Sequence, residues 1–217
     1  MLTPVVRRVS ILVLKKTSLA GLFLGHFINK ARFERYEFAE YAVQLAESNA
    51  KLAELQMKYA YYDQMTGLPN RQAYAEKAEQ LSKAFPALCC VVMADINGLK
   101  TANDTLGHEA GDELIIGAAE CLRKSFDGVE TIYRLGGDEF AVVTESTEAD
   151  AKDRLTQLEK ICADWKGNHV KELSLSWGLA SAEEFSDFDT LKKTADQRMY
   201  EYKSHYYQST GKNRRKR

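Results

Sequence analysis

Two short stretches place carboxylates where apolar strands begin or end. The run LCCVVMAD is continuous and apolar, which is typical of a buried strand, and it stops at Asp95. In YRLGGDEFAVV, Gly136 and Gly137 predict a tight hairpin turn. Asp138 and Glu139 follow that turn at the mouth of the next apolar strand. A carboxylate in such a place must be solvated, paired or bound to a metal.

If the two strands are neighbours, Asp95 and Asp138 meet at one edge of a sheet. Their hard oxygen ligands suit Mg²⁺, which prefers one or two carboxylates plus substrate phosphates to a full protein cage. A pair of metals about 3.5–4 Å apart would activate an attacking hydroxyl and stabilise the leaving oxygen in phosphoryl or nucleotidyl transfer. Taken alone, two strand-end aspartates are more often structural, so the neighbouring motifs decide between these interpretations.

Four segments together resemble the signature segments of GGDEF-domain diguanylate cyclases. They are DQMTGLPNR at 63–71, DINGLKTANDTLGHEAGDEL at 95–114, GGDEF at 136–140 and ADQRMYEYK at 195–203. The resemblance covers about residues 62–212 and is specific, because all four motifs occur in the family's order and spacing. Members of this family join two GTP molecules into cyclic di-GMP and release two pyrophosphates, on a fold related to adenylyl cyclases and polymerase palms.

The resemblance implies a catalytic centre built from the strand end and the hairpin. Asp95 and Asp138 would bind two Mg²⁺ ions, or Mn²⁺, through their side chains, with the backbone carbonyl of Ile96 as a further ligand. Glu139 would sit beside them and help to activate the attacking ribose 3′-hydroxyl. The two glycines of the hairpin would let the backbone approach the α-phosphate, because no Cβ stands in the way.

The same resemblance implies the substrate contacts. Asn103 and Asp112 match the positions that read guanine, and an Asp can accept from both the ring N–H and the exocyclic amine, which adenine cannot offer. Lys100 and Lys203 match the lysines that hold the β- and γ-phosphates as point charges. His108 also falls in the nucleotide loop, and we interpret it as a packing residue of that loop rather than a base.

The residues by themselves leave plainer roles open for these side chains. Asn103 could stabilise a turn, and Asp112 could cap a helix that begins at Glu113. The two lysines could be ordinary surface residues.

The chain departs from the family pattern at two places. Many members carry an R-x-x-D product-binding site that starts nine residues before the first hairpin glycine, where this chain reads DGVE at 127–130. Because an acidic residue cannot replace an Arg that binds phosphate, we predict no product inhibition through that site. Near the end, Tyr207 stands where the family has an Arg. Either Lys212 or Arg214 replaces that Arg in reaching the triphosphate, or the contact is lost, which would affect GTP affinity more than chemistry.

Composition sets few limits on function. The 30 basic and 31 acidic side chains nearly balance, so charge gives no argument for nucleic-acid binding and we expect none. The four cysteines show no C-x-x-C and no regular spacing, and we predict four reduced, packed thiols in a cytosolic setting: Cys89, Cys90, Cys121 and Cys162.

The first thirty residues are apolar but are interrupted by Arg7, Arg8, Lys15 and Lys16. Their longest uncharged run, residues 17–28, is far shorter than the ~20 residues that a spanning helix needs, and no small-residue cleavage site follows it. Three interpretations stay open: a membrane-surface helix, a helix that docks on a partner, and the remnant of a truncated sensor region. We therefore expect a cytoplasmic protein, with association with the inner face of the membrane as an alternative.

Residues 31–62 contain neither Pro nor Gly and predict a long helix. Its apolar residues alternate by four and three, a weak heptad seam with one polar member: Phe38, Tyr41, Leu45, Ser48, Leu52, Leu55 and Tyr59. We prefer a parallel dimer helix to a single helix lying on the domain. The reason is that two half-sites, each with one GTP, must face each other, and a dimer helix raises the effective concentration of the second site.

Turn signals and periodicity predict the elements that position these residues. A turn at 63–71 is followed by a helix over 72–84, the strand ending at Asp95, a loop with one helical turn over 96–112, a helix over 113–126 and the hairpin. A helix over 148–165, a strand within 172–181 and a helix over 187–207 complete the chain. This order predicts an α+β fold, with a mainly antiparallel sheet flanked by helices.

We divide the chain into an N-terminal segment (1–30), a linker helix (31–62), a catalytic domain (63–213) and a basic tail (214–217). The leading hypothesis is an active diguanylate cyclase that uses GTP and works as a homodimer. A non-catalytic GTP-binding or cyclic-dinucleotide regulator is the alternative, but degenerate members usually lose a metal ligand or a hairpin glycine, which this chain keeps. A cyclase for other nucleotides is a third hypothesis, and Asp112 argues against it.

Overall fold

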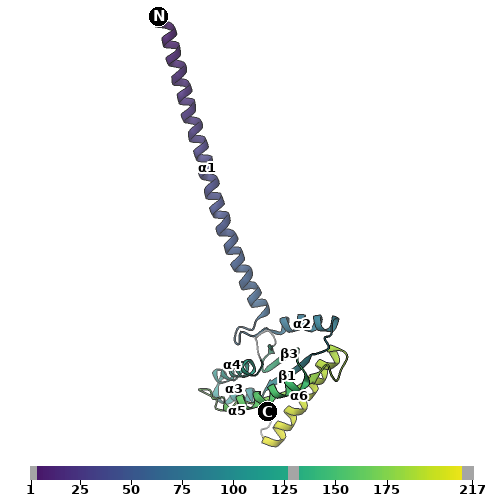
Figure 1. The fold of residues 1–217 in the computed structure, drawn as a ribbon. Coiled ribbons are helices and arrows are strands. Elements are labelled where there is room, and N and C mark those ends of the chain that lie inside the picture. Colours follow the sequence, from purple (N-terminus) through teal and green to yellow (C-terminus); the bar gives the residue numbers. More distant parts are fainter. Residues whose placement is uncertain (1–3, 127–131, 212–217) are drawn as a thin grey trace. The chain divides into compact units, whose positions relative to one another are not determined.

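The computed structural model of the chain describes residues 4–126 and 132–211 (Figure 1). It forms two compact units, residues 1–56 and residues 57–217, which are treated separately below. Helix α1 (Pro4–Tyr61) forms the described part of the first unit, and its last residues belong to the second. The helix predicted over 31–62 is therefore confirmed, and it extends back to Pro4, a residue that suits the first position of a helix.

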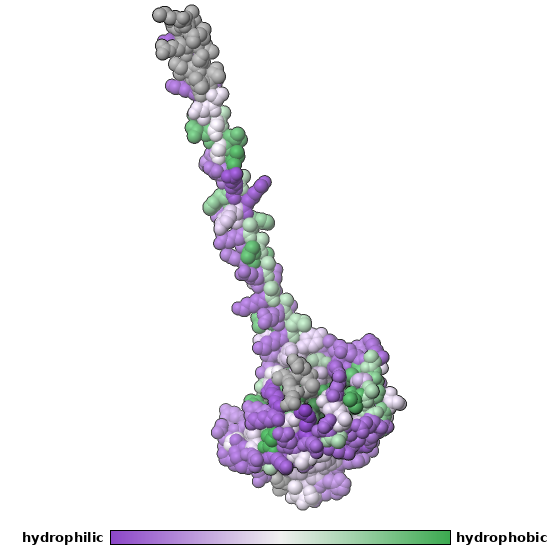
Figure 2. All heavy atoms as spheres, viewed as in Figure 1, coloured by the Kyte–Doolittle hydropathy of each residue, from purple (hydrophilic) through white to green (hydrophobic). Residues whose placement is uncertain are grey.

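The heptad residues of α1 are exposed in the single chain. Phe38, Leu45 and Leu55 expose 74%, 47% and 42% of their surface. Figure 2 shows apolar side chains interspersed with hydrophilic ones along this helix. Within the residues that the structure describes, no helix has an apolar stretch long enough to cross a membrane.

The second unit is built on a four-stranded antiparallel sheet with the order β2-β3-β1-β4. Its strands are β1 (Cys90–Ile96), β2 (Ile132–Gly136), β3 (Glu139–Thr144) and β4 (Leu175–Ser181). All residues of β1 are buried, as expected for a central strand that is covered on both faces, and β1 pairs with both β3 and β4. The α+β fold with an antiparallel sheet is confirmed.

Side chains of β1 alternate between two apolar cores, one on each face of the sheet. Val91 and Met93 belong to a core shared with α2 (Arg71–Lys83) and α6 (Phe188–Thr210). On the other face, Val92 and its alternate neighbours belong to a core shared with α4 (His108–Ser125) and α5 (Glu148–Asp164). Helices therefore cover both faces of the sheet (Figure 1). The four cysteines are buried and free, as predicted.

The loop expected over 96–112 is wrong, because most of this segment is helical. Helix α3 (Leu99–Leu106) follows β1 directly, and α4 starts at His108 rather than Glu113. Gly98 and Gly107, with φ of 77° and 91°, make the sharp turns before and after α3. The Asn and Asp residues between them suggested a loop, but the burial of Leu99 on the core outweighs that local preference.

Gly178 in β4 allows α6 to lie unusually close to the sheet. A Cβ at Gly178 would come within 2.1 Å of the Ala195 carbonyl oxygen and 2.2 Å of the Met199 nitrogen. Because glycine has no side chain, the helix backbone packs directly on the strand backbone. Lys203, one turn after Met199, is thereby brought to the end of β1 where Asp95 lies.

Candidate functional site

The end of β1 and the β2–β3 hairpin meet at one edge of the sheet. Gly136 and Gly137 have φ of 132° and 55°, so the turn uses the positive φ that only glycine adopts easily. The register pairs Asp95 with Glu139, and the Ile96 N–H donates to the Asp138 carbonyl at 3.1 Å. The predictions of a tight hairpin and of neighbouring strands are both confirmed.

Asp95 and Asp138 converge on the ammonium group of Lys203. Lys203 Nζ hydrogen-bonds Asp95 Oδ1 and lies 3.9 Å from Asp138 Oδ2. Asp95 and Lys203 are buried, whereas the side chain of Asp138 is 38% exposed. Burial raises the pKa of Asp95 to about 6; the charges of Asp138 and Glu139 add to this effect and the hydrogen bond from Lys203 opposes it. The arrangement is one that holds a cation between two carboxylates.

This donor set fits a magnesium ion. The described residues contain no group of three or more His, Cys, Asp or Glu side chains that could form a complete protein cage. The edge of the sheet offers two carboxylates instead, the number that Mg²⁺ takes from a protein when substrate phosphates complete its coordination. The position of the Lys203 ammonium shows that both carboxylates reach a single positive charge.

Glu139 points toward Arg71 at the start of α2. Arg71 Nη2 lies 3.6 Å from Glu139 Oε2, and Arg71 Nε donates to the Leu135 carbonyl at 2.6 Å. Both side chains of this ion pair are about half exposed or more. The last residue of the DQMTGLPNR segment thus contacts both strands of the hairpin.

A second arginine, Arg134 in β2, links the first residue of the DQMTGLPNR segment to the hairpin turn. Arg134 Nη1 donates to both carboxylate oxygens of Asp63, at 2.9 and 3.0 Å, and Nη2 donates to the Gly137 carbonyl at 3.0 Å. Burial raises the pKa of Asp63, but hydrogen bonds from Thr66 and Arg134 lower it by more, so it falls below its usual value. The roles of these two arginines and of Asp63 were not predicted from the sequence. The sequence did offer one signal: Asp63 and Arg71 are the first and last residues of the DQMTGLPNR motif.

The predicted guanine readers lie on neighbouring helices, α3 and α4. A Cβ on Gly111 would come within 2.0 Å of Asn103 Oδ1, so Asn103 packs directly against the residue that precedes Asp112. Asn103 is half-buried and Asp112 is exposed. The alternative that Asp112 caps a helix beginning at Glu113 is wrong, because α4 begins at His108, which is its exposed first residue.

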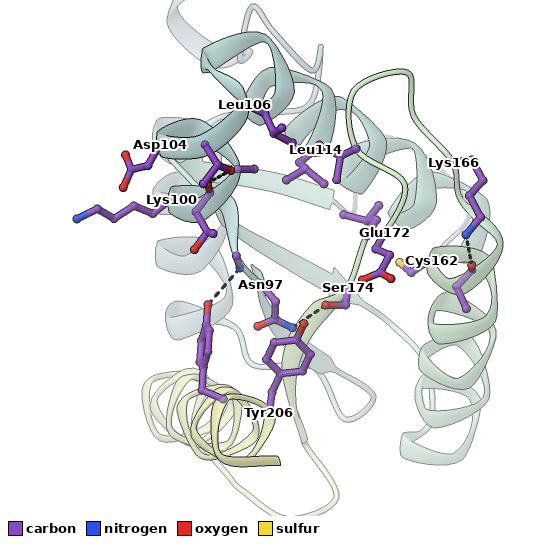
Figure 3. Close-up of a pocket in the computed structure, with 18 of the residues that line it drawn as sticks. Asn97, Lys100, Asp104, Leu106, Leu114, Cys162, Lys166, Glu172, Ser174 and Tyr206 are labelled. Atoms are coloured by element: carbon purple, nitrogen blue, oxygen red, sulfur yellow. Dashed lines mark hydrogen bonds between the residues drawn. The ribbon is translucent and has the colours of Figure 1, made fainter. Parts of the chain in front are cut away.

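Lys100 and Tyr207 are among the residues that line a pocket of about 870 Å³, which is formed by α3, α4, α5, α6 and the segment before β4. Figure 3 shows this pocket. Tyr207 Oη accepts a hydrogen bond from the Gly98 N–H at 3.1 Å. Asp95, Asp138 and the two predicted guanine readers do not line this pocket. Residue 207 therefore supports the turn between β1 and α3 with a hydroxyl where the family pattern has a cation.

The departure at 127–130 and the candidate substitutes Lys212 and Arg214 lie outside the described residues. The predicted absence of product inhibition through that site and the role of these two basic residues therefore stay predictions.

Comparison with known proteins identifies the family. The family described as "Diguanylate cyclase, GGDEF domain" matches residues 60–209, and the chain belongs to it. Diguanylate cyclase DgcN of Escherichia coli K12 is 32% identical over 175 residues, which are 77% of this chain and 42% of DgcN. The bifunctional diguanylate cyclase and cyclic di-GMP phosphodiesterase MucR of Pseudomonas aeruginosa is 37% identical over 145 residues, which are 64% of this chain and 21% of MucR.

Solved structures agree with this assignment. The GGDEF domain of TpbB, also called YfiN, from Pseudomonas aeruginosa aligns with a TM-score of 0.57 and 31% identity, over 67% of this chain and 90% of that one. Diguanylate cyclase SiaD of the same species, bound to its activator SiaC, aligns with a TM-score of 0.61 over 92% of this chain and 80% of that one. At 19% identity, the likeness to SiaD concerns the fold alone. The chain spans less than half the length of DgcN and MucR.

Proposed function

We propose that this chain is a diguanylate cyclase that condenses two GTP molecules into cyclic di-GMP and two pyrophosphates. The observation that carries the proposal is the convergence of Asp95 and Asp138 on one positive charge beside a Gly-Gly turn. Such an edge can hold a divalent ion while an α-phosphate approaches the exposed backbone of Gly136 and Gly137.

Each residue of the edge has a part in the proposed reaction. Asp95, Asp138 and the Ile96 carbonyl would hold two Mg²⁺, which would supply Lewis-acid activation of the 3′-hydroxyl and stabilise the leaving pyrophosphate. Glu139 pairs with Asp95 across the two strands, so its carboxylate would accept the proton of the hydroxyl. Asn103 and Asp112 would read guanine, while Lys100 and Lys203 would neutralise the outer phosphates.

Catalysis on this proposal needs two copies of the chain. One half-site offers a single guanine-reading pair, so a monomer would bind GTP without forming a dinucleotide. The exposed seam of α1, which includes Phe38 and Leu45, offers a surface for a parallel helix pair that would raise the effective concentration of the second half-site. Signals that change this pairing would then change activity.

The location of the protein is also a proposal. The free cysteines favour a cytosolic setting. Leu22, Phe23 and Phe27 are each more than half exposed on α1, so contact of this segment with the inner face of the membrane is the alternative.

The test of the proposed function is the identity of the product. The purified chain is incubated with Mg²⁺ and GTP, ATP or an equal mixture, and the products are separated by chromatography. Cyclic di-GMP from GTP, with no mixed dinucleotide, is the expected result. Bound GTP without any dinucleotide, also at high protein concentration, would favour the regulatory alternative instead.

Tyr207→Arg is expected to lower the KM for GTP about tenfold with little change in kcat, because a charge-assisted contact to phosphate is added. Tyr207→Phe is the matched control, since it removes only the hydroxyl that accepts from Gly98 and adds no charge. Steady-state kinetics of the three proteins distinguish these effects. An unchanged KM in Tyr207→Arg would mean that this position does not face the triphosphate.

Gly111→Ala is expected to weaken GTP binding about tenfold without unfolding the protein. The new Cβ would displace Asn103 Oδ1, which lies 2.0 Å from its position, while Ala in a helix interior is favoured over Gly by about 1 kcal/mol. Calorimetric titration with GTP measures the effect. Gly25→Ala is the control, because it makes the same change in a helix with open space around it. Equal affinity in both variants would argue against Asn103 as a guanine reader.

A further inference from the structure

We propose that Lys203 is the resident counter-ion of the carboxylate pair, and that a divalent cation must displace its ammonium group from between Asp95 and Asp138 before the site can be loaded. Lys203 then becomes available to the outer phosphates of the nucleotide. The inference rests on the proposed function, because it concerns how the same site is filled.

Lys203 is buried beside the two carboxylates. Lys203 is only 8% exposed, its Nζ hydrogen-bonds Asp95, and it lies 3.9 Å from Asp138. Helix α6, which carries Lys203, packs its backbone closely on Gly178 of β4. A lysine whose only role was to bind phosphate would be expected at the exposed surface rather than buried against the end of β1.

The charge of Lys203 balances that of Asp95. Asp95 is buried and has Asp138 and Glu139 as acidic neighbours, so its ionised form needs a positive partner. Lys203 supplies that charge. An ammonium and a divalent cation cannot share the same oxygens, because like charges at this distance repel strongly. One of them must leave, and the flexible four-carbon stem of lysine allows it to move.

The consequence is coupling between metal and nucleotide binding. A metal that arrives alone must displace Lys203 and leave its ammonium without a partner in a buried position, so binding is weakened. A metal that arrives with GTP brings phosphates that accept the displaced ammonium. Metal and nucleotide therefore increase each other's affinity, and the coupling passes through Lys203.

The test measures metal binding in the absence of nucleotide, which does not depend on catalysis. Mn²⁺ is titrated into the purified chain, and free Mn²⁺ is counted by electron paramagnetic resonance. Lys203→Gln is expected to bind Mn²⁺ at least about tenfold more tightly than the parent, whereas its affinity for GTP with Mn²⁺ falls. Lys193→Gln is the control: Lys193 is exposed on α6, the same helix, so this variant's Mn²⁺ affinity without nucleotide should stay within about twofold of the parent's.

A second variant, Lys203→Arg, tests the same inference if Lys203→Gln does not fold. Lys203→Arg retains the charge and can grip a carboxylate with two hydrogen bonds, so it is expected to weaken Mn²⁺ binding about tenfold. Opposite shifts in the two variants support the inference. Unchanged or weaker Mn²⁺ binding in folded Lys203→Gln, or unchanged binding in Lys203→Arg, would overturn it. The proposed function fails separately, if the parent makes no cyclic di-GMP.

Discussion

Asp138→Asn is expected to reduce cyclic di-GMP synthesis by about 10³-fold while the protein stays folded. The substitution removes one of the two carboxylates that converge at the sheet edge but keeps the size of the side chain. The backbone contact from the Ile96 N–H to the residue 138 carbonyl is preserved as well. Initial rates of product formation from GTP and Mg²⁺, with a thermal unfolding curve for each protein, measure both parts of the expectation.

Glu145→Gln is the matched control for this substitution. Glu145 is an exposed carboxylate directly after the other end of β3, so the same loss of charge should leave the rate unchanged. If Asp138→Asn retains more than about a tenth of the parent rate, Asp138 is not a metal ligand of the reaction.

Arg134→Met is expected to lower the free energy of unfolding by about 3 kcal/mol and to slow synthesis as well. The side chain of Arg134 is 9% exposed and that of Asp63 is 23% exposed, so removal of one partner leaves a largely buried carboxylate without its cation. The Gly137 carbonyl would lose its hydrogen-bond donor too, which loosens the turn beside the proposed α-phosphate site. Urea unfolding and steady-state kinetics measure the two effects.

Acid should diminish this difference in stability. The pKa of Asp63 is lowered in the folded protein, so its contribution is present above the usual carboxylate pKa and is lost as the pH falls below it. The difference between the parent and Arg134→Met is therefore expected to shrink below about pH 4.

Arg198→Met provides a comparison for Arg134→Met. Arg198 also forms a two-oxygen ion pair, with Glu184, but the side chains are 39% and 29% exposed and lie away from the hairpin. Its loss should cost about 1 kcal/mol or less and leave the rate unchanged. Equal losses of stability and activity in the two variants would show that Arg134 has no special role in supporting the turn.

Much of the candidate site could be predicted from local sequence. A continuous apolar run that ends in Asp95 predicts a buried strand with a carboxylate at its end, and two glycines before Asp138 predict the turn that returns to it. Both features depend on neighbouring residues alone, and both are present in the structure. Helix α1 was predictable for the same reason, since residues 31–62 lack any helix breaker.

Contacts between distant segments could not be predicted in this way. Lys203 and Asp95 are 108 positions apart in the sequence. They meet because Gly178 lets α6 pack closely on β4, and the hydrophobic periodicity of the sequence does not predict that contact. Arg134 and Asp63 are 71 positions apart, and only the tertiary structure brings them together. The helix α3 was missed because burial of Leu99 outweighs a local composition that favours a loop.

The proposed reaction is tested most directly by measuring both of its products, cyclic di-GMP and pyrophosphate. The purified chain is incubated with GTP and Mg²⁺ at two protein concentrations, and cyclic di-GMP and pyrophosphate are measured in the same samples. Two pyrophosphates are expected for each cyclic di-GMP, with a rate per chain that rises with protein concentration because two half-sites must meet. Release of phosphate or pyrophosphate without cyclic di-GMP at either concentration, or a rate per chain independent of concentration in a chain that stays monomeric, would contradict the proposed function.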